Sequence, residues 1–274
     1  MNGHGELVKR YGPWALVTGA AHGLGRAFAE LLAAAGFDLL LVDVDGEANE
    51  TLADRLRARS GVEVRALVLD VGRAELAERA AELARDHDIG VLINNVGIGP
   101  VGRFLQRELD EHLRTVDINC KATLVLTHVI GRRMVARGRG AIVIVSSGSA
   151  LTGSPRVANY AATKGYGLNL AAALSDELGP SGVDVIALCP GLLRTRATEL
   201  RPPKTDAAPL VTMHEPEPVA RAALDALVAG RGPLVVPGAL EKLSWHVLGR
   251  LAPRKLLLRM LGATMDKLYP DGGD

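Results

Sequence analysis

The sequence predicts an α/β fold: a single doubly wound, Rossmann-type domain built on a parallel sheet of about seven strands with helices on both faces. Three observations support this prediction. Short apolar runs alternate with longer stretches of helical periodicity along most of the chain. Several of the short runs are almost continuously apolar, which is typical of parallel strands covered on both faces. A glycine-rich turn joins the first apolar run to the first helix.

The predicted elements alternate in order along the chain. Strands are expected at 14–19, 37–43, 62–70, 89–95, 141–147 and 183–191, with a short seventh at 233–238. Helices are expected at 26–36, 48–61, 73–87, 107–138 and 155–179. Gly36 and Gly61 end the first two helices, as glycine commonly does.

No repeat or long linker divides the sequence, so residues 1–274 are expected to form one domain. The proline-rich piece 201–219 is the one long irregular segment, and a loop of that length is usually functional or disordered. We expect a substrate loop at 192–216 and a C-terminal helical extension at 240–270.

Composition and charge exclude several classes of protein. The 274 residues are 48% apolar and 23% charged, and the net charge of +1 gives no basic excess for a nucleic-acid partner. Cys120 and Cys189 lie in apolar runs and are expected to be free thiols in a reducing compartment. The pattern of histidine and cysteine predicts no metal site. Without an apolar leader or a long apolar run, the protein is expected to be soluble and cytoplasmic.

The glycine-rich turn TGAAHGLG, residues 18–25, indicates a phosphate-binding loop. Gly19, Gly23 and Gly25 allow a sharp turn and a close approach of the backbone to a ligand. The next helix offers free N–H groups and the positive end of its dipole to a pyrophosphate. The spacing is G-x-x-x-G-x-G, not the commonest dinucleotide fingerprint, and a tight turn without a ligand is the alternative.

Asp43 ends the second predicted strand, 18 residues after Gly25. A carboxylate at this position accepts hydrogen bonds from ribose hydroxyls and repels a 2′-phosphate, so it favours NAD over NADP. The alternative is an aspartate that caps the turn at Asp45. His22 could hold a phosphate when it is protonated, which keeps NADP open.

Seven short motifs follow one another between about residues 12 and 195, each at the expected end of an element. They are TGAAHGLG, Asp70 in LVLDV, NNVG at 94–97, Asn119 in VDINC, a serine in IVSSGS, YAATK at 160–164 and PGLLRT at 190–195. Each is weak alone, but together and in order they are specific. The chain thus resembles the short-chain dehydrogenase/reductase family. Two stretches, YGPWALVTGAAHGLG and IGVLINNVG, are similar to its branch of hydroxysteroid dehydrogenases and long-chain 3-ketoacyl-CoA reductases.

Tyr160 and Lys164 lie one helical turn apart and are expected to face the same way. Hydride transfer between an alcohol carbon and a nicotinamide needs a group that moves the hydroxyl proton. A free tyrosine has a pKa of about 10, too high for an efficient base. A nearby ammonium would lower that pKa. Among the four tyrosines, only Tyr160 has lysine at i+4, so it is predicted to be the general acid/base; simple helix packing is the alternative.

A serine hydroxyl would polarise the substrate carbonyl, and local chemistry leaves Ser146, Ser147 and Ser149 open. The resemblance selects Ser147, because the family's serine commonly precedes its tyrosine by 13 residues. The resemblance also implies that Asn119 holds a water linking Lys164 to solvent. The alternatives are a strand-end cap for the serine and an ordinary helix-interior amide for Asn119.

The resemblance further implies a set of cofactor contacts. Asp70 and Val71 would meet the adenine, Asn95 and Gly97 the adenosine ribose side, and Lys164 the nicotinamide ribose. The turn after the sixth strand would hold the carboxamide and the diphosphate. The full expected set is Gly19, His22, Gly23, Leu24, Gly25, Asp43, Asp70, Val71, Asn95, Gly97, Tyr160, Lys164, Pro190, Gly191, Leu193 and Thr195.

The substrate is expected over the carboxyl ends of the strands. Leu151, Leu192, Leu193 and Met213 would line an apolar pocket for a steroid, a terpenoid or an acyl chain, although such residues are also common in plain cores. Three hypotheses remain open: an NAD(H)-dependent alcohol dehydrogenase or ketone reductase, an NADPH-dependent 3-ketoacyl or ketosteroid reductase, and a catalytically silent dinucleotide-binding regulator.

The family resemblance implies a homodimer or homotetramer. The C-terminal part mixes leucine, tryptophan and methionine with basic residues, and Pro253 is expected to break it into two helices. A basic amphipathic helix can lie on a membrane surface. Packing on the domain or on a second subunit is the more common alternative.

Overall fold

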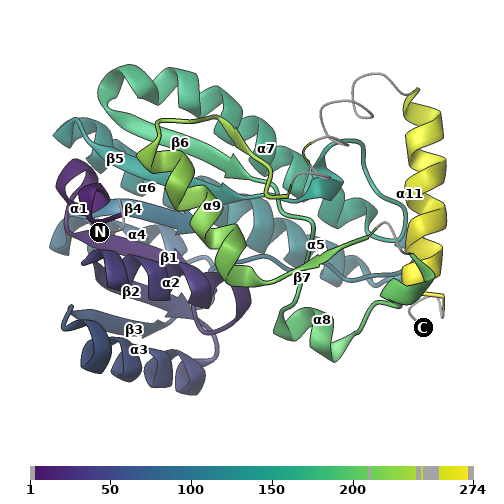
Figure 1. Ribbon diagram of the computed structural model, residues 1–274, viewed down its shortest axis with the longest axis horizontal. Helices are drawn as coiled ribbons and strands as arrows, with labels where there is room; N and C mark the ends of the chain where they lie inside the picture. Colours follow the sequence, from purple (N-terminus) through teal and green to yellow (C-terminus); the bar gives the residue numbers. More distant parts are fainter. Residues whose placement is uncertain (1–3, 209–210, 239–241, 243–252, 271–274) are drawn as a thin grey trace.

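The structure of the protein is a computed structural model that describes residues 4–208, 211–238, 242 and 253–270. Within these residues, seven strands form a parallel sheet in the order β3-β2-β1-β4-β5-β6-β9 (Figure 1). The strands are β1 (Trp14–Thr18), β2 (Asp38–Asp43), β3 (Val64–Val68), β4 (Ile89–Asn94), β5 (Gly140–Val145), β6 (Val183–Leu188) and β9 (Leu234–Val235). Because the order reverses direction at β1, the sheet is doubly wound, and the predicted fold class is confirmed.

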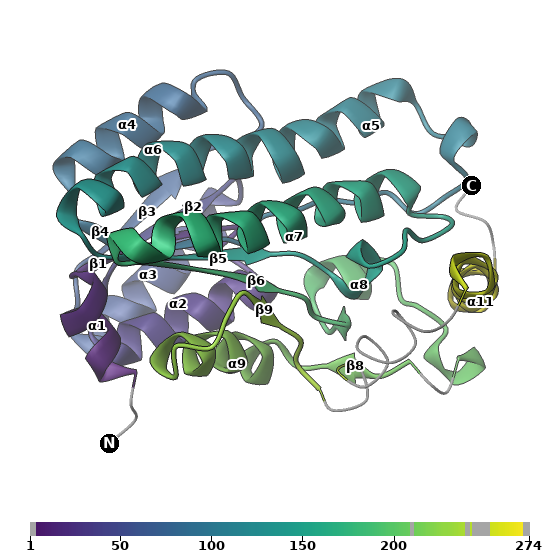
Figure 2. The same cartoon turned by 90° about the horizontal axis from the view of Figure 1, so that it is seen from above.

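Helices cover both faces of the sheet (Figure 2). One face carries α1 (Gly5–Tyr11), α2 (Gly23–Ala35), α3 (Gly46–Ser60) and α9 (Pro216–Val228). The other carries α4 (Leu76–Asp86), α5 (Leu109–Val116), α6 (Ala122–Arg137) and α7 (Ala158–Leu178). The two layers of helices bury both sides of the central strands, which explains why those strands are apolar throughout.

Alternate residues of each central strand enter two separate cores. Val17 and Leu41 pack with the layer that includes α2 and α9, whereas Leu16 and Leu40 pack with the layer that includes α4 and α6. All four side chains are fully buried or nearly so. This two-sided burial fixes the register, because a slip of one residue would exchange the two faces.

The segment 107–138, predicted as one helix, is interrupted. Five residues of π-helix, Asp117–Lys121, separate α5 from α6. A π-turn adds one residue to the helical ring and shifts the face that the following residues present. The interruption places Asn119 on the inner side of the helix, where it is buried.

The irregular segment predicted at 201–219 contains more structure than expected. Pro216 lies in the first turn of α9, where the missing N–H of proline leaves no helical hydrogen bond unmade. Two short strands, β7 (Leu192–Leu193) and β8 (Met213–His214), pair in parallel to form a separate ribbon. The short helix α8 (Arg196–Leu200) lies between them in the sequence.

The C-terminal helix α11 (Arg254–Leu268) begins directly after Pro253, as the helix-breaking role of this proline predicts. Residues 239–241 and 243–252 of the predicted extension lie outside the described residues. Contacts tie α11 to the rest: Arg156 pairs with Asp266, and the Lys204 N–H donates to the Leu268 carbonyl at 2.9 Å. The helix therefore lies beside the loops at the carboxyl end of the sheet (Figure 1).

Candidate active site

The candidate site lies where the parallel strands end. The carboxyl ends of β1, β2, β4, β5 and β6 share one edge of the sheet, so the loops that follow them meet there. In open α/β sheets, this edge beside the reversal of strand order is where ligands bind. The predicted site residues all belong to these loops, to the helices that follow them or to the loop after β3.

The turn after β1 has the tight form that its glycines predict. A side chain at Gly25 would place its Cβ 2.0 Å from the Gly19 carbonyl oxygen, so the two backbone segments touch. Gly19 and Gly23 have φ angles of +65° and +52°, which glycine adopts without strain. The helix α2 starts at Gly23, so its first N–H groups lie at this turn and have no acceptor within the helix. Leu24 is buried beneath it.

Asn95 supports this loop from the neighbouring strand. Its side-chain amide donates to the Thr18 carbonyl at 2.8 Å and to the Gly19 carbonyl at 3.3 Å. The amide is thereby engaged with protein atoms, which gives Asn95 a loop-holding role beside the predicted cofactor contact.

Asp43 lies at the edge of the cleft and holds the local backbone. One carboxylate oxygen accepts from the Ala21 N–H at 2.9 Å, and the other accepts from the Asp45 N–H at 3.0 Å. The turn-capping alternative is therefore part of its role. Each oxygen retains a further lone pair for a ribose hydroxyl.

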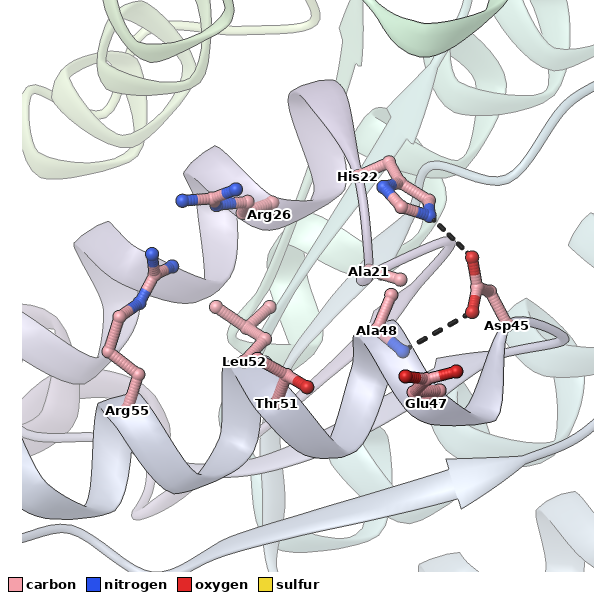
Figure 3. Close-up of a pocket in the computed structure, with 9 residues that line it drawn as sticks. All are labelled: Ala21, His22, Arg26, Asp45, Glu47, Ala48, Thr51, Leu52 and Arg55. Atoms are coloured by element: carbon pink, nitrogen blue, oxygen red, sulfur yellow. Dashed lines mark hydrogen bonds and ion pairs between the residues drawn. The ribbon is translucent and has the colours of Figure 1, made fainter.

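Beyond Asp43, a shallow cavity of about 350 Å³ opens between α2 and α3 (Figure 3). His22 lines it, and its Nε2 lies 2.8 Å from a carboxylate oxygen of Asp45. The other oxygen of Asp45 accepts from the Ala48 N–H and caps α3. Arg26 and Arg55 line the far side, and both pair with Glu30.

The adenine side of the predicted cleft contains Asp70 and Val71. Arg114 donates to Asp70 at 2.6 Å. Burial alone would raise the pKa of Asp70, but hydrogen bonds from Arg114 and the Gly72 N–H, with the charges of Arg114 and Arg73, together lower that pKa. The Val71 side chain is buried in the core on the α4 side, so only its backbone faces the loop region.

Ser147, Tyr160 and Lys164 come together at the end of β5 against α7. Lys164 is buried, and its Nζ donates to the Val145 carbonyl at 2.8 Å and lies 5.7 Å from the centre of the Tyr160 ring. Burial lowers the pKa of Lys164 to about 8, although Cys120 and Cys189 act in the opposite direction. The lysine thus remains mostly protonated at neutral pH.

The pKa of Tyr160 is raised, whereas the sequence predicts a lowered value. Burial of the phenol is the largest cause, and a hydrogen bond with Ser147 only partly offsets it. The expectation of a lowered pKa for Tyr160 is therefore wrong, because burial of the phenol, with a smaller contribution from Cys189, outweighs the hydrogen bond with Ser147.

The three candidate serines differ in position. Ser146 is buried and donates to the Lys164 carbonyl at 2.7 Å, so it faces away from the cleft. The Ser147 hydroxyl bonds with Tyr160 and accepts from the N–H of Ser149 at 3.2 Å. Alternation of side chains along an extended strand separates the two neighbours in this way.

Asn119 holds the loop after β4, which contains Ile98 and lies against Tyr160 and Lys164. Its amide donates to the Ile98 carbonyl at 2.8 Å and to the Thr163 hydroxyl at 2.9 Å, and its oxygen accepts from the Ile98 N–H at 2.9 Å. These bonds engage the side chain that was expected to hold a water. The structure thus gives Asn119 a positioning role that the sequence did not predict.

Two glycines in the same loop allow it to lie against the catalytic pair. A Cβ at Gly97 would lie 2.8 Å from the Lys164 Nζ, and one at Gly99 would lie 2.4 Å from the Tyr160 ring. Gly97 was predicted as a cofactor contact, whereas Gly99 was missed. The signal for Gly99 was local, a second glycine two residues after the NNVG motif, but its contact with Tyr160 follows only from the fold.

The turn after β6 closes the site from the other side. The Pro190 carbonyl accepts from the Gly148 N–H at 2.9 Å, which joins the ends of β5 and β6 next to Gly191. Leu192 pairs with Met213 in the β7–β8 ribbon, and Leu193 follows it. Three of the four residues predicted to line an apolar pocket therefore share one ribbon, and the fourth, Leu151, lies in the loop after β5 and is partly exposed.

Within the described residues, no group of three or more histidine, cysteine or acidic side chains is placed to hold a metal ion. In that part of the chain, no helix combines the length and apolar character needed to cross a membrane.

The fold is a dinucleotide-binding fold, and a family model described as short chain dehydrogenase matches residues 13–206. The chain belongs to this family. It is 37% identical over 206 residues to a very-long-chain 3-oxoacyl-CoA reductase of Podospora anserina, covering 72% of this chain and 60% of that protein. It is 34% identical over 196 residues to the inactive hydroxysteroid dehydrogenase-like protein 1 of Rattus norvegicus, covering 70% and 59%. The chain thus spans about 60% of the length of these relatives.

Solved structures agree with this membership. One that concerns 7β-hydroxysteroid dehydrogenase stereoselectivity superposes with a TM-score of 0.86 at 26% identity, covering 93% of this chain and 98% of that one. A short-chain dehydrogenase from Sphingobium yanoikuyae in complex with NADPH has a TM-score of 0.77 at 33% identity, with coverage of 90% and 95%. Another from Burkholderia phymatum in complex with NAD has a TM-score of 0.75 at 25% identity, with the same coverage. Structural neighbours therefore bind either nicotinamide dinucleotide.

Proposed function

We propose that this protein is an oxidoreductase that transfers a hydride between NAD(H) and a hydrophobic secondary alcohol or ketone. The observation that carries the proposal is the meeting of Ser147, Tyr160 and Lys164 at the sheet edge that also bears the glycine turn. A proton-transfer group beside a dinucleotide cleft is what alcohol oxidation requires.

The residues at the cleft fit a nicotinamide dinucleotide. The Gly19–Gly25 contact leaves a cradle without side chains, and the start of α2 presents N–H groups to a diphosphate. Asp43 would bind a ribose hydroxyl and would repel a 2′-phosphate, which favours NAD over NADP. When bound, the nicotinamide ring accepts or donates the hydride.

The chain's own side chains would handle the proton. Tyr160 Oη would take the hydroxyl proton of an alcohol or give it to the oxygen of a ketone, and the Ser147 hydroxyl would hold that same oxygen. The Lys164 ammonium would stabilise the phenolate once a substrate or ribose draws its Nζ from the Val145 carbonyl. Asn119 and Gly99 would hold the loop after β4, which contains Ile98, against Tyr160.

The substrate class rests on the apolar ribbon formed by Leu192, Leu193 and Met213. The similarity to a very-long-chain 3-oxoacyl-CoA reductase supports a second candidate, an NADPH-dependent reductase of 3-ketoacyl or ketosteroid substrates. The similarity to an inactive relative keeps a silent regulator as a third. Ser147, Tyr160 and Lys164 are all present and lie in one cluster, which supports a catalytic function over a silent regulator. We also propose a homo-oligomer in the cytoplasm, in line with the family and the free thiols.

Titration of the purified protein with NADH and NADPH, followed by nicotinamide fluorescence, tests the cofactor proposal. We expect NADH to bind at least about tenfold more tightly, because one ionised carboxylate near a 2′-phosphate costs about 1–2 kcal/mol. The Asp43→Asn variant removes the charge and keeps an acceptor for the Ala21 N–H. It is expected to narrow the difference between the affinities for NADH and NADPH. Tighter binding of NADPH by the wild type would instead place the 3-ketoacyl reductase candidate first.

A further inference from the structure

Arg196 joins the segment after β6 to the opposite side of the cofactor cleft. Its Nη1 lies 2.7 Å from the Asp45 carboxylate and 2.8 Å from the His22 Nε2. Asp45 follows β2, and His22 precedes the first turn of α2, so three segments distant in sequence meet at one point. The His22–Asp45 half of this cluster is visible at the edge of the cavity (Figure 3).

A second contact places the same segment over the phosphate loop. A Cβ at Gly23 would lie 2.9 Å from the Thr195 Cγ2, so Thr195 lies directly against the loop. The Thr195 N–H donates to the Thr198 hydroxyl, which in turn donates to the Leu193 carbonyl at 2.8 Å. These bonds give the segment a fixed shape in which Thr195 and Arg196 face the loop together.

The charges of Asp45 and Arg196 persist across the working pH range. The hydrogen bonds from His22, from the Ala48 N–H and from Arg196 hold the pKa of Asp45 at about 2. Arginine remains protonated at any physiological pH. Neither charge of the Arg196–Asp45 ion pair is therefore lost within that pH range.

We infer that Arg196 anchors residues 192–200 over the cofactor-binding cleft through its contacts with Asp45 and His22. A bound dinucleotide then leaves only after these contacts break. The inference rests on the proposed function, in which the diphosphate lies on the glycine turn and a ribose lies at Asp43. A ligand in that position would lie close to Thr195, which contacts the glycine turn at Gly23, and to Arg196, which contacts His22 and Asp45. Arg196 is thus a positioning residue that acts on cofactor retention and not on hydride transfer.

Arg194, two residues earlier, provides a matched control. It pairs with Glu215 at 2.8 Å, and both side chains are well exposed, like those of many surface ion pairs. Its partner, Glu215, precedes α9 and is not part of the phosphate loop, so this pair does not connect the segment to that loop. Loss of Arg194 removes a charge of the same sign from the same segment but leaves the contacts of Arg196 with Asp45 and His22 intact.

Stopped-flow measurement of NADH release, with a large excess of NAD added to trap free sites, tests the inference. An exposed ion pair changes an equilibrium about two- to fivefold, so Arg196→Ala should speed release by that factor. Arg196→Glu places like charges together and should speed release about tenfold. Arg194→Ala should release NADH at the wild-type rate.

Asp45→Asn gives an independent check, because asparagine still caps α3 while it removes the charge. Its effect should match that of Arg196→Ala, and the double variant should release NADH no faster than either single variant. The thermal unfolding midpoint of each variant should stay within a few degrees of the wild type, which separates cofactor retention from a general loss of structure.

A wild-type release rate in Arg196→Glu would overturn the inference, as would an equal acceleration in Arg194→Ala. Either result would leave the proposed function standing, since NADH would still bind. A wild-type protein that binds neither NADH nor NADPH would overturn the proposed function, and with it the role of Arg196 in cofactor retention.

Discussion

Replacement of Tyr160 by phenylalanine is expected to reduce turnover about a hundredfold to ten-thousandfold, the range that a positioned general acid/base contributes. The ring is retained, so its packing against Gly99 and its position on α7 are unchanged. Only the hydroxyl that bonds with Ser147 is lost. NADH affinity should therefore remain near the wild-type value.

The measurement is steady-state turnover of a hydrophobic ketone, with NADH binding recorded in parallel. Tyr166→Phe is the matched control, because Tyr166 lies on the same helix six residues later and is partly exposed. It should leave turnover unchanged. A folded Tyr160→Phe variant with near-normal turnover would rule out the proton-transfer role of Tyr160.

Replacement of Gly25 by alanine is expected to weaken NADH binding at least about tenfold, equivalent to about 1.4 kcal/mol. The added Cβ would lie 2.0 Å from the Gly19 carbonyl oxygen and 2.7 Å from the Asn95 amide. Because the nearest obstacle is backbone, the turn itself must open, and the N–H groups at the start of α2 move with it. Overpacking of this kind also costs about 1–3 kcal/mol of unfolding free energy.

Fluorescence titration and chemical unfolding of the same variant separate these two effects. Gly179→Ala serves as the control, since a Cβ there meets no atom within 4 Å among the described residues and φ is −50°. It should bind NADH like the wild type. Unchanged NADH affinity in a folded Gly25→Ala variant would show that the glycine turn is not where the diphosphate lies.

The sequence predicted those parts of the fold that depend on local patterns. Runs such as Leu39–Val42 are apolar on both faces, and the two-core burial of alternate residues shows the physical reason. Pro216 misled the prediction because proline was read as a sign of a loop, whereas in the first turn of α9 it is compatible with the helix. The π-turn around Asn119 was missed because its hydrogen-bond pattern has no sequence period of its own.

The candidate site was predictable to the extent that its residues follow motifs. Ser147, Tyr160 and Lys164 come together as their spacing suggested. The direction of the Tyr160 pKa shift was not predictable, because it depends on burial by a loop distant in sequence. The contacts of Gly99 and Arg196 were also out of reach, because their partners are set by tertiary structure and not by local sequence.

Transfer of deuterium to a ketone from NADH that carries deuterium at both C4 positions of the nicotinamide tests the central claim most directly. A panel of hydrophobic ketones, including a ketosteroid and a 3-ketoacyl thioester, would be incubated with the protein and the products examined by mass spectrometry. The account predicts an alcohol one mass unit heavier, with the label on the carbinol carbon, and loss of this product in Tyr160→Phe. Tight NADH binding without labelled alcohol from any member of the panel would contradict it and would favour the dinucleotide-binding regulator.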